Sequence, residues 1–149
     1  MNVNIHKHKR QTGFSFHKNI TNCQGLVPGL LDDVGKWLVQ TGIPHGKIID
    51  VQIVIAEALN NVIEHGFPFE RSGHVSIDID VTNNVIVAKI CDNGKEFTPP
   101  ETKETPLQGE VDLEDLPEGG FGWLLIREIT TSFTFRRVAH ENRLVLNFC

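Results

Sequence analysis

The sequence lacks any apolar run long enough to cross a lipid bilayer. Apolar runs such as residues 85–91 and 123–126 are far shorter than the roughly 20 residues that a membrane helix needs. The N-terminus is polar and basic and has no apolar segment of the kind found in secretion signals. We therefore expect a soluble, cytoplasmic protein with no membrane partner.

Cysteine is scarce, and low-complexity tracts are missing. Cys23, Cys91 and Cys149 are odd in number and lie far apart, so they fit neither a disulfide framework nor a C-x-x-C metal site. We expect reduced thiols, as is usual in a cytosol. A chain of 149 residues that is 40% hydrophobic suits one globular domain, which we place at residues 14–149 after a flexible basic arm at residues 1–13.

The chain has fewer basic than acidic residues, and the excess of acidic residues lies in one stretch. The formal net charge of −5 argues against a nucleic-acid partner. Residues 95–118 carry eight acids against two lysines, a balance of −6, while the rest of the chain sums to +1. This stretch also holds four prolines, so we expect a long acidic loop. Loops of such length are usually functional or disordered.

Residues 51–66 form the stretch with the clearest helical pattern. Placed on a helix, these apolar residues share one wide face: Val51, Ile55, Ala58, Leu59, Val62 and Ile63. Glu57, Asn61 and His65 fall four residues apart along the edge of that face. A carboxylate can accept a proton and an amide oxygen can hold a hard cation, so this row could line a cleft. The same row is also what the solvated side of an amphipathic helix looks like.

The remaining pattern predicts an α+β two-layer sandwich. We expect a mixed, mainly antiparallel sheet of about five strands with three helices on one face. The predicted strands cover residues 14–21, as an edge, 74–81, 85–92, 132–138 and 143–148, with a turn at residues 140–142 between the last two. The predicted helices begin at residue 22, capped by Thr21 or Asn22 and closed by Gly42, and cover residues 45–65 and 123–130.

Two glycine motifs follow the central helix. Asp92-Asn93-Gly94 ends a predicted strand, where Asp92 could accept a hydrogen bond from an exocyclic amine and Gly94 could let a flat base approach. Asp-Asn-Gly is also a common turn sequence. Gly119, Gly120 and Gly122 lie at the start of the last helix, where free backbone N–H groups suit a phosphate chain.

Together these motifs resemble the N, G1 and G2 boxes of the GHKL, or Bergerat-fold, ATPases. The stretches A-E-A-L-N-N-V-I-E-H-G and L-P-E-G-G-F-G-W-L-L-I-R are most similar to the anti-sigma-factor serine/threonine kinases of bacterial partner-switching systems. The resemblance covers residues 14–148. It implies a histidine-kinase-like ATPase fold that binds ATP or ADP with Mg²⁺.

The resemblance also implies roles for single residues. Asn61 would ligate Mg²⁺, and Glu57 would be the base that deprotonates a partner's hydroxyl. Asp92 would bind the adenine amine, with Gly94 making room for the ring. His65 would support the phosphate region or pack at the helix end. Gly119, Gly120 and Gly122 would wrap the phosphates at the end of an ATP lid. This lid would cover residues 95–118, and we expect it to be disordered without nucleotide.

The implied function is that of an anti-sigma factor. Such a protein phosphorylates a serine or threonine of an anti-sigma-factor antagonist and sequesters a sigma factor, and the resemblance also implies a homodimer. Glu96 lies where many relatives continue to a second glycine, and Glu118 lies where some relatives carry an arginine. The alternative is therefore a nucleotide-gated binding module with little or no kinase activity. A histidine-kinase role is disfavoured, because the sequence has no phosphoacceptor helix pair.

Overall fold

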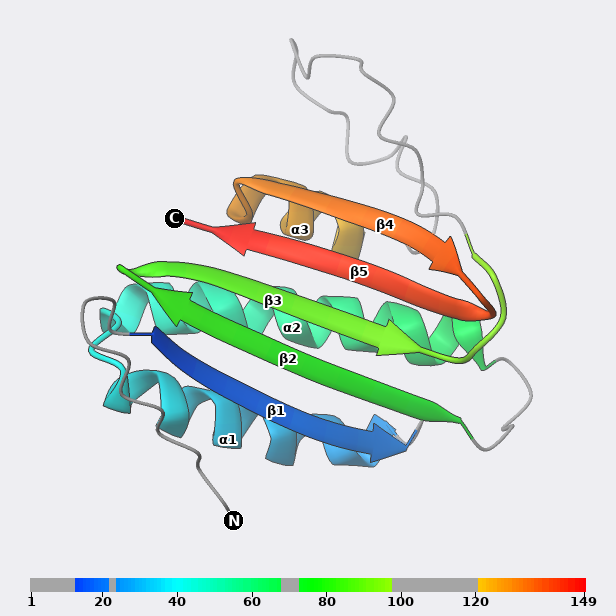
Figure 1. Cartoon of the computed structure of the whole chain (residues 1–149), viewed down its shortest axis with the longest axis horizontal. Coiled ribbons are helices and arrows are strands. Elements are labelled where there is room, and N and C mark those ends of the chain that lie inside the picture. The colour runs from blue at the N-terminus through cyan, green and yellow to red at the C-terminus, as the bar shows by residue number, and fades with distance from the viewer. Residues whose placement is uncertain (1–12, 22–23, 68–72, 98–120) are drawn as a thin grey trace, which may run out of the picture.

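The computed structural model describes residues 13–21, 24–67, 73–97 and 121–149. Within these residues, five strands form one sheet in the order β1-β2-β3-β5-β4, and every neighbouring pair is antiparallel (Figure 1). The strands are β1 (Gly13–Thr21), β2 (His74–Thr82), β3 (Val85–Asp92), β4 (Ser132–Val138) and β5 (Glu141–Phe148). The predicted sheet is confirmed, with β1 at an edge and with antiparallel pairing throughout.

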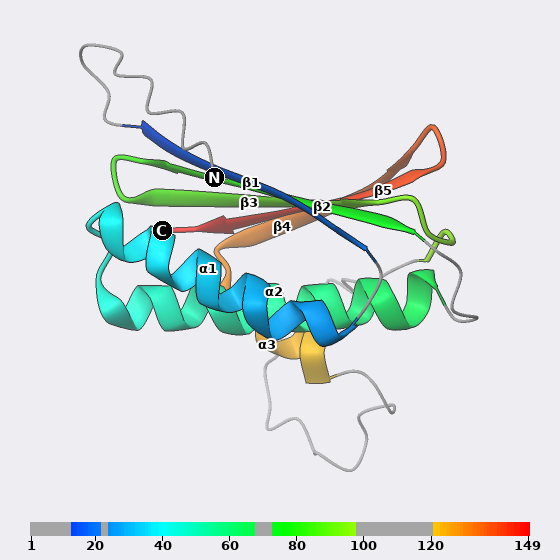
Figure 2. The ribbon, with the colours of Figure 1, turned by 90° about the horizontal axis from the view of Figure 1, so that it is seen from below.

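The helices cover one face of this sheet, as Figure 2 shows. In the described ranges they are a short 3₁₀ turn, η1 (Gln24–Leu26), and the helices α1 (Val27–Gln40), α2 (His45–Gly66) and α3 (Phe121–Ile129). The fold is thus the two-layer α+β sandwich that the sequence predicts. Among the helices that the structure describes, none is both long enough and apolar enough to cross a membrane.

The core lies between α2 and the inner face of the sheet. All six residues of the predicted apolar face of α2 are buried. From β5, Leu144, Leu146 and Phe148 point to the same core, in strict alternation with more exposed residues. Buried apolar residues therefore recur every three to four positions along α2 and every second position along the strands. This pattern is expected when helices cover one face of a sheet.

The first helix begins later than the sequence predicts. Thr21 is still paired with His74 in the ladder between β1 and β2, so it cannot cap a helix. Leu26 takes the capping position of α1 and makes no side-chain hydrogen bond there. Pro28 is tolerated only in the first turn of a helix, which explains why α1 begins at Val27.

The predicted turn before the last strand is also wrong. Residues Glu141 and Asn142 belong to β5, and the turn consists of Ala139 and His140 alone, with φ of 48° and 66°. A two-residue hairpin turn of this kind needs positive φ at both positions and usually contains Asn or Gly. Ala139 and His140 carry no such signal, which is why the sequence misplaces the turn. Helix α3 likewise begins two residues earlier than predicted, at Phe121.

We expect Ile55→Ala to lower the free energy of unfolding by about 2–5 kcal/mol, because Ile55 is fully buried between α2 and the sheet and its truncation leaves a cavity. Ile53 lies on the same helix but is 38% exposed. Ile53→Ala should change the free energy by no more than about 0.5 kcal/mol. Urea unfolding followed by circular dichroism measures both, and equal losses would contradict the orientation of α2.

Candidate functional site

The start of α3 lies directly against the polar row of α2. A methyl group on Gly122 would lie 2.7 Å from Glu57 Oε2 and 3.3 Å from Asn61 Nδ2. A larger residue would displace the Glu57 carboxylate, so the glycine lets the first turn of α3 and these two side chains form one cluster. The structure therefore brings together Glu57, Asn61 and Gly122. Gly119 and Gly120 lie outside the described residues.

Asn61 is a buried polar side chain at the centre of this cluster. It is 7% exposed, and its Nδ2 has no hydrogen-bond partner among the residues that the structure describes. Leaving such a group unpaired costs about 1–3 kcal/mol. A carboxamide can present either its oxygen or its nitrogen by rotation, so Asn61 has unused capacity to bind a ligand.

The described residues fit a magnesium ion held mainly by its nucleotide. Within them, no group of three or more His, Cys, Asp and Glu side chains is placed to hold a metal ion. Magnesium is often bound by only one or two protein oxygens together with substrate phosphates and water. The unsatisfied carboxamide of Asn61 matches that requirement, since it offers one oxygen beside the helix start.

Asp92 forms a second cluster at the end of β3. It is 3% exposed, and its Oδ1 accepts hydrogen bonds from the Gly94 backbone N–H at 2.9 Å and from Asn142 Nδ2 at 3.0 Å. Within the described part of the chain, Oδ2 accepts no hydrogen bond and remains available. Burial raises the pKa of Asp92, and the two hydrogen bonds and the nearby charge of Arg137 partly offset this rise.

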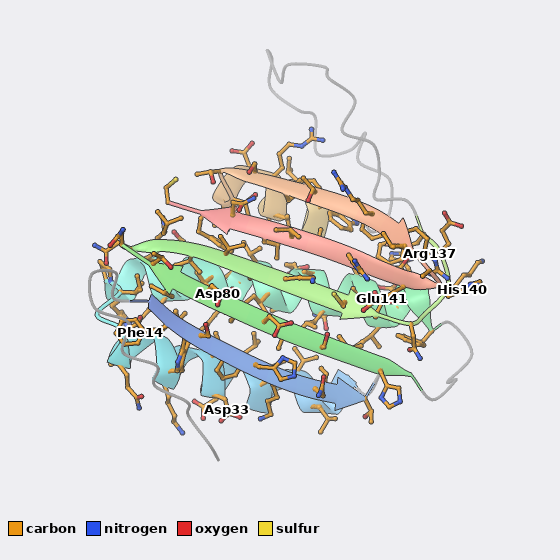
Figure 3. The ribbon with its side chains drawn as sticks, in the orientation of Figure 1. Phe14, Asp33, Asp80, Arg137, His140 and Glu141 are labelled. Carbon is orange, nitrogen blue, oxygen red and sulfur yellow. The ribbon has the colours of Figure 1, made fainter. Side chains whose placement is uncertain are left out.

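Arg137 and Asn142 complete this cluster, although none of the sequence motifs pointed to either residue. They face each other across β4 and β5, and Asn142 faces Asp92 across β5 and β3. Figure 3 labels Arg137 at the end of the sheet where β4 ends and β5 begins. The Asn142 position could have been found by extending the alternation of Leu144, Leu146 and Phe148 back by one step, which places it on the core side.

The turn after β3 is joined to the end of α2. The backbone N–H of Lys95 donates a hydrogen bond of 2.8 Å to the carbonyl of Gly66, the last residue of α2. A methyl group on Gly94 would lie 2.6 Å from that carbonyl oxygen and 2.9 Å from Asp92 Oδ1. A side chain at position 94 would therefore collide with the end of α2. The predicted role of Gly94 beside a base stays a prediction. This glycine lets β3 and α2 meet.

His65 differs from the other two members of its row. It is exposed at the end of α2, and the centroid of its ring lies 6.2 Å from that of Phe97. Phe97 in turn packs against Phe135 at 4.9 Å. The contact observed for His65 is therefore aromatic packing against Phe97. The rest of the predicted lid, residues 98–118, and residues 1–12 of the predicted arm lie outside the described residues. Gly13, the last residue of that arm, belongs to β1.

The open face of the sheet carries a separate hollow of about 270 Å³. Its lining is basic and comes from β3, β4 and β5: Lys89, Thr134, Arg136, Arg143 and Val145. These residues alternate with the buried ones, so they point away from the helices and from both clusters. We assign no function to this hollow.

Comparison with known proteins decides the family. The family described as "Histidine kinase-like ATPase domain" matches residues 21–148. The chain belongs to this family. Nucleotide binding is the property that the family name implies. One cluster lies on α2 at Glu57 and Asn61, and the other lies beside the last residue of the same helix, Gly66.

Curated relatives of this ATPase domain are named serine-protein kinase RsbW. The protein from Oceanobacillus iheyensis is 30% identical over 90 residues, which are 59% of this chain and 57% of the relative. The proteins from Listeria innocua and Halalkalibacterium halodurans are 26% and 28% identical over 60% and 59% of this chain. The matches span only 54–59% of the length of these three relatives.

Solved structures support the same fold. The RsbU and RsbW domains of Rv1364c from Mycobacterium tuberculosis align with a TM-score of 0.64 at 15% identity, over 90% of this chain and 31% of that chain. The blue-light-activated histidine kinase of Erythrobacter litoralis aligns with a TM-score of 0.50 at 16% identity, over 71% of this chain and 31% of that chain. At such identities the likeness concerns the fold alone.

We expect Asp92→Asn to fold normally and to bind ATP at least about tenfold more weakly. The new side chain keeps an oxygen for both existing hydrogen bonds but replaces Oδ2 by an NH₂ group, which opposes the adenine amine with a second donor. Calorimetric titration with ATP measures this loss. Asp80→Asn, on the open face of β2, is the matched control and should bind as the unchanged protein does.

The same variant has a pH signature. Because the pKa of Asp92 is raised in the folded state, its carboxyl group favours folding most at low pH, and this contribution is lost as the pH rises through the raised value. Relative to Asp92→Asn, the unchanged protein should therefore lose stability between the ordinary pKa of aspartate and the raised one. Urea unfolding at a series of pH values measures the free energy of unfolding of both proteins. A difference between them that does not change with pH would contradict the raised pKa.

Proposed function

We propose that the chain is a cytoplasmic anti-sigma regulator that binds Mg·ATP and phosphorylates a serine or threonine of an antagonist protein. The supporting observation is the convergence of Glu57 and Asn61 on Gly122, on the same helix, α2, whose last residue Gly66 is joined to the turn beside Asp92. The names of the RsbW relatives support the kinase class. The specific substrate, the metal and the partners are parts of the proposal.

In this proposal Asp92 binds the base. Its free Oδ2 accepts a hydrogen bond from the exocyclic amine of adenine, which fixes the orientation of the nucleotide. The triphosphate then extends toward the start of α3, where the backbone N–H groups of a helix beginning and its dipole favour negative charge. Gly122 keeps that helix start close to Asn61.

Asn61 and Glu57 perform the other two tasks. Asn61 would hold Mg²⁺ through its amide oxygen, and the ion would supply positive charge to offset that of the phosphates. Glu57 accepts the proton of the antagonist's hydroxyl group as its oxygen bonds to the γ-phosphorus and the bond to the ADP oxygen breaks. Transfer adds close to two negative charges to the antagonist, which would end its contact with this protein and leave the regulator free to sequester a sigma factor.

A second candidate is a nucleotide-gated binding module without useful transfer activity. The observation that favours it is Glu118, immediately before the glycines, because an acid there would repel a γ-phosphate where some relatives have an arginine. Binding of nucleotide by Asp92 and Asn61 suffices for this function. A homodimer is compatible with both candidates.

We expect Glu57→Gln to lower the rate of antagonist phosphorylation about 10²–10⁴-fold, because the amide cannot accept the hydroxyl proton. Affinity for Mg·ATP should stay within about threefold, since Glu57 acts on the partner's hydroxyl. Transfer of labelled phosphate and equilibrium titration measure the two quantities. Glu64→Gln, at an exposed position of the same helix, is the control.

Two results separate the candidates. If the unchanged protein binds nucleotide but labels no antagonist, the kinase proposal fails and the binding module stands. If Glu57→Gln phosphorylates as fast as the unchanged protein, Glu57 is not the base.

A further inference from the structure

Asn142 is held in one orientation by its neighbours. It is 1% exposed, and its Nδ2 donates hydrogen bonds to Asp92 Oδ1 at 3.0 Å and to the Lys95 carbonyl at 2.9 Å. Its Oδ1 accepts one from Arg137 Nη1 at 3.0 Å. Reversing the amide would place a donor against Arg137 and an acceptor against two acceptors. The carboxamide of Asn142 therefore cannot turn without losing all three bonds.

This fixed amide determines how Asp92 presents its carboxylate. With Gly94 N–H and Asn142 Nδ2 both on Oδ1, that oxygen has two donors and the plane of the carboxylate is set. The second oxygen, Oδ2, is the one left to meet a ligand. A carboxylate held in this way accepts hydrogen bonds only, so it favours a donor on the ligand and opposes an acceptor.

Arg137 supports the same arrangement from β4. Its Nη1 donates to the Gly94 carbonyl at 2.8 Å as well as to Asn142 Oδ1, so one guanidinium group joins the β3 turn to the amide. Its positive charge also lies close enough to Asp92 to favour the ionised carboxylate. Removing it would loosen the turn and the amide together.

We propose that Arg137 and Asn142 are positioning residues that make the base site selective for a purine with a 6-amino group. This inference rests on the proposed function, because it concerns the same nucleotide site. Neither residue needs to touch the nucleotide. Each acts through Asp92, by holding Oδ1 occupied and Oδ2 turned outward as an acceptor.

The experiment compares two nucleotides that differ only at position 6 of the base. ATP carries the amine, and purine riboside triphosphate lacks it. The ratio of their dissociation constants isolates the contact with Asp92, because a general loosening of the site weakens both nucleotides equally. Calorimetric titration in the presence of Mg²⁺ measures both constants on the full chain.

We expect the unchanged protein to prefer ATP by about tenfold or more, the value of one charge-assisted hydrogen bond. In Asn142→Ala this preference should fall to about threefold or less. Arg137→Met, which keeps the aliphatic stem, should reduce it in the same direction. The matched controls change an asparagine and an arginine of the same two strands that lie on the open face of the sheet. Asn147→Ala and Arg136→Met should keep the full preference for ATP.

The outcomes are distinct. If Asn142→Ala and Arg137→Met weaken both nucleotides equally and keep the ratio, the two residues are merely structural and the inference is overturned. If Asn142→Ala does not fold, the ratio in Arg137→Met decides. If the unchanged protein binds neither nucleotide, the proposed function itself fails. If it binds both with equal affinity, nucleotide binding stands and the selectivity is overturned.

Discussion

The carbonyl of Gly66 accepts a hydrogen bond from Lys95 N–H at 2.8 Å, and the arrangement of the site depends on this one backbone contact. It joins the end of α2 to the turn that follows β3, and the small size of Gly94 makes the approach possible. Since α2 also carries Asn61 and Glu57, the contact fixes Asp92 relative to both. Gly66 lies about 7.5 Å along the helix axis from Asn61. A ligand with a base at one end and phosphates at the other suits two polar clusters held apart in this way.

Most of the fold could be predicted from the sequence, because it follows from local periodicity. The helix α2 and the hairpin of β2 and β3 have clear patterns of apolar residues, and Asn83 and Asn84 mark the hairpin turn with φ of 50° and 64°. The errors fall where no local signal exists. Ala139 and His140 adopt the same kind of turn without the usual residues, and α1 begins only where Pro28 fits, after strand pairing has ended.

The site could be predicted only in part. Sequence spacing and family resemblance both point to Glu57, Asn61 and Gly122, and the structure places these three residues close together. Arg137 and Asn142 were missed because their place beside Asp92 depends on strand register. Asn142 bonds Asp92, 50 positions away in sequence, and Arg137 bonds Gly94, 43 positions away. The turn predicted at residues 140–142 added to this error, because it placed Asn142 outside the last strand. The close approach of Gly94 to the end of α2 is a contact that sequence spacing alone does not indicate.

The central claim is that the cluster of Glu57, Asn61 and Gly122 and the cluster of Asp92 form one nucleotide site. Titration of the protein with ATP in the presence and absence of Mg²⁺ tests this claim most directly. The account predicts measurable binding that becomes tighter with Mg²⁺, and an Asn61→Ala variant that keeps the metal-free affinity but loses the gain from the metal. A flat calorimetric trace under both conditions would contradict the account. Binding that Mg²⁺ leaves unchanged would contradict the part assigned to Asn61.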